Sequence, residues 1–126
     1  MATFIIAEAG VNHNGDLALA RQLIDAAVAS GADAVKFQTF SAGDLAVADA
    51  PKAVYQVQND GVGSQLQMLE RLELTVDQHY ELASYCYECG ISFLSTAFGL
   101  TELKLLMQLG VGAIKVASGE VTHRPL

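Results

Sequence analysis

Four short apolar runs alternate along the chain with segments whose apolar residues recur every three or four positions. The runs cover residues 3–8, 33–39, 91–95 and 113–117. Short apolar runs between turn signals are typical of buried strands, whereas spacing by three and four is typical of amphipathic helices. The order strand, helix, strand, helix, strand, helix, strand predicts a parallel sheet with right-handed crossovers.

The three intervening segments carry helix start and stop signals. Asp16 is placed to cap a helix over about 17–30, and Thr75 opens a second with Gln78 three residues on, as in a capping box. A third is expected over about 101–109, and a glycine follows each helix. The residues expected to face the core are Ala20, Leu23, Ile24, Ala27 and Val28, then Leu82, Tyr85, Cys86 and Cys89, then Leu103, Leu106 and Met107.

Residues 41–64 break this rhythm, since they show no regular pattern. Loops of this length in compact domains are usually functional or disordered. The segment leaves the carboxyl end of the second strand, so it can reach a site there. A short helix over 65–72 is predicted to follow, with Leu66, Leu69 and Leu72 inward.

Composition narrows the class of protein. Apolar residues make up 52% of the chain, yet no run approaches the ~20 residues that a membrane span needs. The N-terminus lacks the pattern of a signal peptide, so a cytoplasmic protein is expected. A net charge of −7 argues against nucleic acid as a partner. Cys86 and Cys89 lie inside a helical pattern and are predicted to be buried or half-buried thiols, not a redox or metal pair.

Each apolar run ends in side chains that can do chemistry. These are Glu8 at the first, Lys36 and Gln38 at the second, Ser95 and Thr96 at the third, and Lys115, Ser118 and Glu120 at the fourth. Ligands bind at the carboxyl ends of strands in β-α sheets, which predicts one shared site. Two lysines favour a small anion, although a strand-end lysine can also extend to solvent and an acid such as Glu8 can be its structural ion-pair partner.

Length limits the architecture to two alternatives. A closed eight-stranded barrel takes ~250 residues, about twice the 126 residues present. The chain is therefore either a small open α/β sheet or the first half of a (β/α)8 barrel. The turn EAGVNHNGD after the first strand is not the G-x-G-x-x-G of a dinucleotide fold.

Six blocks in order carry a family resemblance: EAGVNHNGD, DAVKFQTF, APKAVYQ, SQLQMLERLELT, FLSTAF and KVASGE. Together they resemble the N-terminal half of the sialic acid (N-acetylneuraminate) synthases and their legionaminic acid relatives. The resemblance implies an α/β fold, a (β/α)8 TIM barrel followed by an antifreeze-like domain. Residues 1–126 would be the N-terminal part of that barrel, with the C-terminal half and the antifreeze-like domain absent.

The same resemblance implies an activity. These transferases condense phosphoenolpyruvate with N-acetylmannosamine or a related amino sugar, release phosphate, and use manganese or magnesium. It implies that Lys36, Thr96, Lys115 and Ser118 hold phosphoenolpyruvate, that Gln38 and Asn59 face the sugar, and that Glu8 and Glu120 are the catalytic acids. Asn59 is equally well an ordinary turn residue. The resemblance places the metal ligands in later strands, so no metal ligand is assigned here, and His79 is expected to be a helix-face residue.

Two alternatives stay open. Another phosphoenolpyruvate-dependent aldol-type synthase is the second reading, and a non-catalytic, self-associating module is the third. A half-barrel exposes its interior and two strand edges, which predicts a homodimer or larger assembly. Alone, the chain is expected to lack synthase activity.

Overall fold

The computed structural model describes residues 2–45 and 64–126, so Asn59 lies outside the described residues. The helices and strands are, in chain order, β1 (Ile6–Gly10), α1 (Leu17–Ala29), β2 (Ala34–Thr39), α2 (Ala42–Leu45), α4 (Gln65–Leu72), α5 (Val76–Cys89), β3 (Ser92–Ala97), α6 (Leu100–Leu109), β4 (Lys115–Val116) and the 3-10 turn η1 (Ser118–Glu120).

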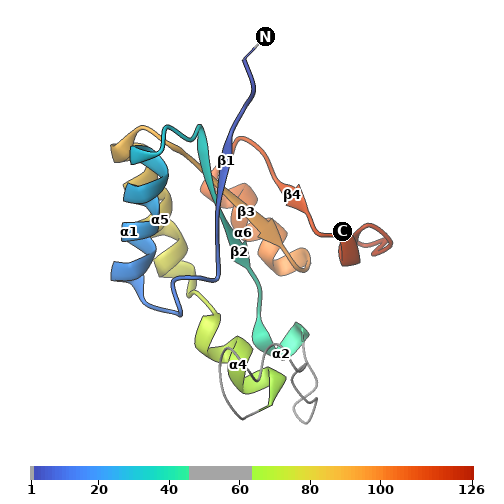
Figure 1. Ribbon diagram of the computed structural model, residues 1–126. Coiled ribbons are helices and arrows are strands. Elements are labelled where there is room, and N and C mark those ends of the chain that lie inside the picture. Colours follow the sequence, from blue (N-terminus) through green and yellow to red (C-terminus); the bar gives the residue numbers. More distant parts are fainter. Residues whose placement is uncertain (1, 46–63) are drawn as a thin grey trace.

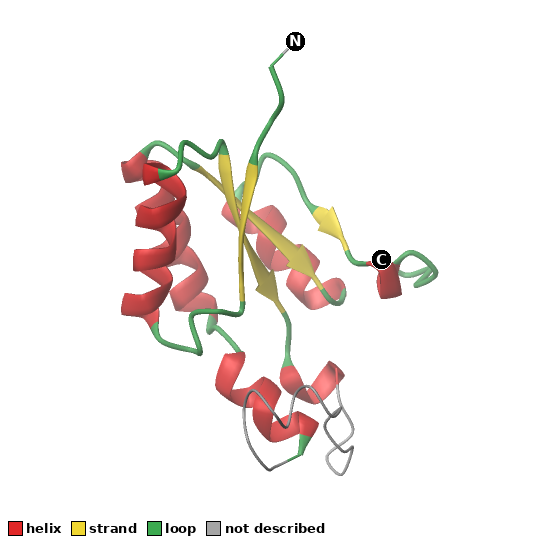
Figure 2. Cartoon of the chain, in the orientation of Figure 1, coloured by secondary structure: helices red, strands yellow, loops and turns green. Residues whose placement is uncertain are grey.

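The four strands form one parallel sheet in the order β1-β2-β3-β4 (Figure 1). Helix α1 packs on β1 and β2, α5 and α6 pack on β3, and α5 contacts both other helices, so the three form one layer. Figure 2 shows these helices beside the strands, with α2 and α4 beyond the strands' carboxyl ends. The prediction of a parallel half-barrel with outer helices is confirmed.

Alternation along the strands divides the sheet into two faces. In β2, Val35 and Phe37 are fully buried beneath the helices, whereas Lys36 and Gln38 point to the opposite, concave face. Phe93 of β3 stacks on Phe37 with ring centroids 5.7 Å apart. The core therefore lies between sheet and helices, and the concave face is free to carry polar groups.

Local signals set the helix ends as predicted. The Asp16 carboxylate accepts hydrogen bonds from the first turn of α1. Thr75 and Gln78 form the expected capping box of α5, and Gly90 ends that helix with φ +73°, a conformation that favours glycine. These ends depend on neighbours in sequence, which is why the pattern located them.

The predicted bounds of the first and fourth strands differ from those in the structure. The first strand was predicted over residues 3–8 but is Ile6–Gly10, because its first paired residue is Ile6, opposite Ala34. The fourth was predicted over 113–117, yet only Lys115 and Val116 pair with β3. Residues 42–45 form the short helix α2 within the segment that was expected to be irregular. Pairing with a neighbour, not apolar character, sets where a strand begins.

Several predicted inward positions also differ. Val28 and Met107 are exposed, because only the centre of each apolar stripe faces the sheet. In α4 the buried residue is Met68, and the three leucines expected inward are only partly buried. His79, expected on the helix face, is buried.

The two cysteines are free thiols, one buried and one half-buried, as predicted. Burial raises the pKa of Cys86 to about 12, so this thiol stays protonated at neutral pH.

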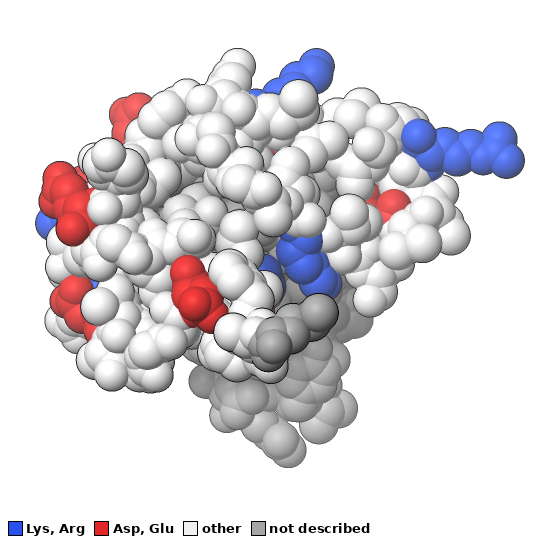
Figure 3. All heavy atoms as spheres, turned by 90° about the horizontal axis from the view of Figure 1, so that it is seen from above, with Lys and Arg blue, Asp and Glu red and all other residues white. Residues whose placement is uncertain are grey.

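In the part of the chain that the structure describes, every helix is too short or too polar to cross a bilayer. Viewed from above, the charged side chains are scattered over a largely uncharged surface (Figure 3).

Candidate functional site

The strand register brings the predicted site residues of four strands to the concave face. Glu8 of β1 is opposite Lys36 of β2, Gln38 of β2 is opposite Thr96 of β3, and Thr96 is opposite Lys115 of β4. Paired residues of neighbouring strands point to the same side of a sheet. These five side chains therefore start from one face, near the carboxyl ends of the strands.

Lys36 is the centre of this group. Its Nζ lies 2.5 Å from Glu8 Oε2 and 3.3 Å from Thr96 Oγ1, and its side chain is only 11% exposed. The Glu8 side chain is 53% exposed, so this ion pair opens to solvent at one end. The structure thus contains the ion pair that was one of the two readings of Glu8.

Gly10 belongs to the site, although the sequence pattern did not single it out. It lies at a register shift after Glu8 and has φ +56°. A Cβ at Gly10 would stand 3.1 Å from Glu8 Oε1 and 3.7 Å from Gln38 Nε2. Glycine therefore leaves room beside the backbone for both side chains.

The site residues of β4 and η1 are held less firmly in the group than those of β1, β2 and β3. Lys115 is exposed and joins the group by register alone. Ser118 and Glu120 follow in η1, where Ser118 is exposed and Glu120 Oε2 lies 2.6 Å from His123 Nδ1. In the described structure, contacts join Glu8, Lys36 and Thr96, while Glu120 is held within its own turn. That partner, three residues further on in the chain, was not predicted.

A polar cluster on the helix side of the same strand ends was also missed. The Thr39 hydroxyl lies 2.7 Å from Ser95 Oγ and 2.9 Å from His79 Nε2. His13, in the loop after β1, is also fully buried. Its Nδ1 accepts a hydrogen bond from Gly15 N at 2.9 Å, and its Nε2 has no partner among the described residues. Burial lowers the pKa of both histidines, and the His79 charge lowers that of His13 further.

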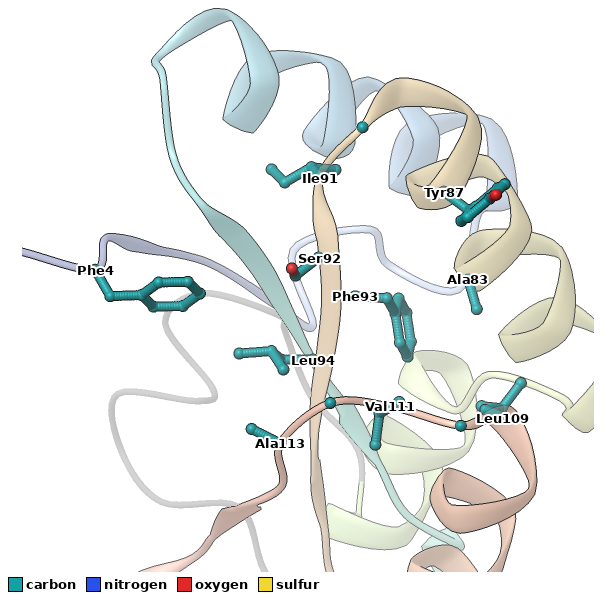
Figure 4. A pocket seen from close by; sticks show the side chains of 13 residues that line it. Phe4, Ala83, Tyr87, Ile91, Ser92, Phe93, Leu94, Leu109, Val111 and Ala113 are labelled. Atoms are coloured by element: carbon teal, nitrogen blue, oxygen red, sulfur yellow. The ribbon is translucent and has the colours of Figure 1, made fainter.

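A separate hollow lies elsewhere among the described residues. It has a volume of about 650 Å³ and opens beside the beginning of β3, between α5 and α6 (Figure 4). Phe4, Tyr87, Phe93 and Leu94 line it with apolar surface. It lacks charged groups and is at the amino end of the strand, so we place the site at the opposite, carboxyl end, where the lysines are.

The chemistry of the concave face suits a small anion. Lys36 and Lys115 supply positive charge, and Thr96 and Gln38 supply neutral donors. Within residues 2–45 and 64–126, no group of three or more His, Cys, Asp or Glu side chains could hold a metal ion.

Comparison with known proteins identifies a family and relatives for the chain. The model of the NeuB family matches residues 23–126. The chain is 52% identical over 126 residues to N,N'-diacetyllegionaminic acid synthase of Campylobacter jejuni, covering 98% of this chain and 37% of that protein. It is 51% identical over 126 residues to the synthase of the same name from Legionella pneumophila, covering 99% of this chain and 35% of that protein. The chain thus spans about a third of the length of these relatives.

A solved structure shares the fold. The N-acetylneuraminic acid (sialic acid) synthetase of Leptospira borgpetersenii, in complex with citrate, superposes with a TM-score of 0.80 at 28% identity. The match covers 99% of this chain and 39% of that one. On the strength of the matched residues and these relatives, the chain belongs to the NeuB family.

Proposed function

We propose that the chain supplies the phosphoenolpyruvate side of a nonulosonic acid synthase, as the first half of its barrel. The observation that carries this is the Lys36–Thr96 contact on the concave face, with Lys115 in register beside it. Family members are phosphoenolpyruvate-dependent nonulosonic acid synthases, and the two legionaminic acid synthases at about half identity support an amino-sugar acceptor.

The reaction joins C3 of the enol to the aldehyde carbon of the open-chain amino sugar, whose aldehyde oxygen takes a proton. Water adds to the cation that forms at C2, and phosphate leaves with cleavage of its C–O bond. Lys36 and Lys115 bind phosphate and carboxylate oxygens as point charges, and the hydroxyls of Thr96 and Ser118 donate to them.

Glu8 has a specific place in this scheme. Its carboxylate neutralises Lys36 in the described structure. An anionic ligand must compete with it for the ammonium group, after which Glu8 and Gln38 face the sugar over Gly10. This arrangement holds Lys36 in place before the ligand arrives and then frees an acceptor for the sugar hydroxyls.

We assign Glu120 the proton transfer to or from the adding water or the sugar. Its carboxylate is bound to His123 in the described structure, so this role requires it to leave that partner. We further propose that Asn59, outside the described residues, contacts the sugar. Manganese or magnesium belongs to the proposed full reaction, which this chain alone is expected not to complete.

The binding half of the proposal can be tested by calorimetric titration with phosphoenolpyruvate. Lys36→Met should weaken binding at least about tenfold, the value of one charged hydrogen bond. Lys104→Met makes the same charge change at an exposed position of α6 and should leave affinity within twofold. Glu8→Gln should tighten binding, because Lys36 no longer has a competing carboxylate. Equal affinity in Lys36→Met and Lys104→Met would overturn the assignment.

A specific observation also favours self-association. β1 and β4 each have one strand neighbour in the described sheet, and Phe4, Ile6 and Val116 are exposed. Val116 is opposite Ala97 on the helix side of the sheet, yet about half of it is exposed. Strand edges and uncovered apolar residues favour pairing with another chain, so we propose a homodimer or larger assembly.

A further inference from the structure

Beneath the strand ends that carry Gln38 and Thr96, buried polar groups form a chain of hydrogen bonds. Ser95 Oγ lies 2.7 Å from Thr39 Oγ1, which lies 2.9 Å from His79 Nε2. His79 Nδ1 in turn lies 2.8 Å from the carbonyl oxygen of Thr75, the residue that caps α5. The three side chains are at most 3% exposed, so each lost bond would leave a polar atom buried without a partner.

The direction of these bonds follows from chemistry. The Thr75 carbonyl can only accept, so His79 Nδ1 donates. A neutral imidazole carries one ring proton, so His79 Nε2 accepts from the Thr39 hydroxyl, which accepts in turn from Ser95. Burial lowers the pKa of His79 and thereby favours this neutral ring. One arrangement of protons satisfies every member of the chain.

The position of the chain links it to the site. Thr39 directly follows Gln38, and Ser95 directly precedes Thr96. Gln38 and Thr96 are register partners on the concave face, whereas their neighbours in this network point to the helices. The network therefore ties the ends of β2 and β3 to the first turn of α5, one residue from the side chains that face the ligand.

We infer that His79 is a positioning residue for the phosphoenolpyruvate site: as a neutral imidazole protonated at Nδ1, it fixes through Thr39 and Ser95 the backbone that aims Gln38 and Thr96. The identity of the ligand rests on the proposed function. The clamp, meaning the hydrogen bonds that join Ser95, Thr39, His79 and the Thr75 carbonyl, is a property of this chain.

Protonation should reverse the direction of these hydrogen bonds. A second ring proton turns His79 Nε2 into a donor, so the Thr39 hydroxyl must accept from it and donate its own proton to Ser95 Oγ. His13, in the loop after β1, is a titratable neighbour of His79. The positive charges of the two protonated rings repel each other, which lowers the pKa of His13. The hydrogen-bond partners of the His79 ring, the Thr39 hydroxyl and the Thr75 carbonyl, are neutral groups.

The test compares three variants of the 126-residue chain. His79→Phe fills the space without hydrogen bonds, and His79→Gln restores an amide oxygen that can accept from Thr39. Leu106→Ala removes a fully buried side chain from α6 and serves as a control for lost stability. For each we measure phosphoenolpyruvate affinity by calorimetry, and the NMR signals of the Gln38 side-chain amide and Thr96 methyl as a function of pH.

His79→Phe should weaken phosphoenolpyruvate binding about fivefold, the value of one neutral hydrogen bond. His79→Gln should recover most of this loss, and Leu106→Ala should change affinity less than twofold. In the wild type, the Gln38 and Thr96 signals should shift with the protonation of His79. In His79→Gln they should not.

The two proposals fail in different ways. If the wild type does not bind phosphoenolpyruvate, the proposed function fails and the NMR titration alone decides the clamp. If the Gln38 and Thr96 signals ignore both His79 protonation and the His79→Phe substitution, His79 is only a satisfied core residue and the inference is overturned.

Discussion

Gly15→Ala is the substitution whose cost the structure determines most directly. Gly15 has φ +76°, a left-handed conformation, in the loop that leads from β1 to α1. A Cβ at this position would stand 2.3 Å from the carbonyl oxygen of Arg71, at the end of α4. Because that atom is backbone, it cannot rotate away, and the loop or the helix end must shift.

The magnitude has two parts. The left-handed conformation costs a residue with a Cβ about 1–2 kcal/mol. Forcing an extra methyl into packed surroundings adds about 1–3 kcal/mol. Gly31→Ala isolates the first part, since Gly31 has φ +75° and nothing within 4 Å of the added Cβ. The Gly15 variant should therefore lose at least about 1 kcal/mol more than the Gly31 variant.

Urea unfolding followed by circular dichroism measures both free energies of unfolding under the same conditions. The larger loss in Gly15→Ala would show that the β1–α1 loop, which carries the buried His13, is packed against α4 in solution. If both variants lost the same free energy, that packing would be refuted, and with it the fixed position of the loop beside the site.

Three further outcomes are expected. Burial lowers the folded-state pKa of His13 and His79 below 6.5, so the free energy of unfolding should be greatest above pH 6.5 and fall as the pH drops below it. Urea unfolding over pH 5–7.5 measures this dependence, which should be weaker in a His13→Gln, His79→Gln double variant. An unchanged pH dependence in that variant would contradict the prediction. Light scattering at micromolar concentration should show a dimer or larger species, and a stable monomer would contradict the proposed association. Incubation with phosphoenolpyruvate, N-acetylmannosamine and manganese should release no phosphate above a Lys115→Ala control, and clear turnover would show that the chain alone is a complete enzyme.

Features that depend on neighbours in sequence could be predicted. The caps at Asp16 and Thr75 and the left-handed Gly90 were correct because each is decided within one helical turn. Strand order and the gathering of Lys36 with Thr96 also followed, since a β-α alternation leaves few parallel arrangements.

Features that depend on packing between elements could not be predicted. His79 has the pattern of an ordinary helical residue, yet it is buried and bonded to Thr39, on a strand forty positions away in sequence. Met107 and Val28 continue their apolar stripes, but the stripe is wider than the strip of helix that meets the sheet. The role of Gly10 became visible only when Glu8 and Gln38 were both found beside it.

NMR mapping of the backbone amides tests most directly the proposal that phosphoenolpyruvate binds at the carboxyl ends of the strands. On titration with phosphoenolpyruvate, the largest chemical-shift changes should fall on residues 36–38, 96–98 and 115–120, and Lys36→Met should reduce them together. Changes centred instead on residues 90–94 and 109–113, which line the apolar hollow at the amino end, would contradict the account.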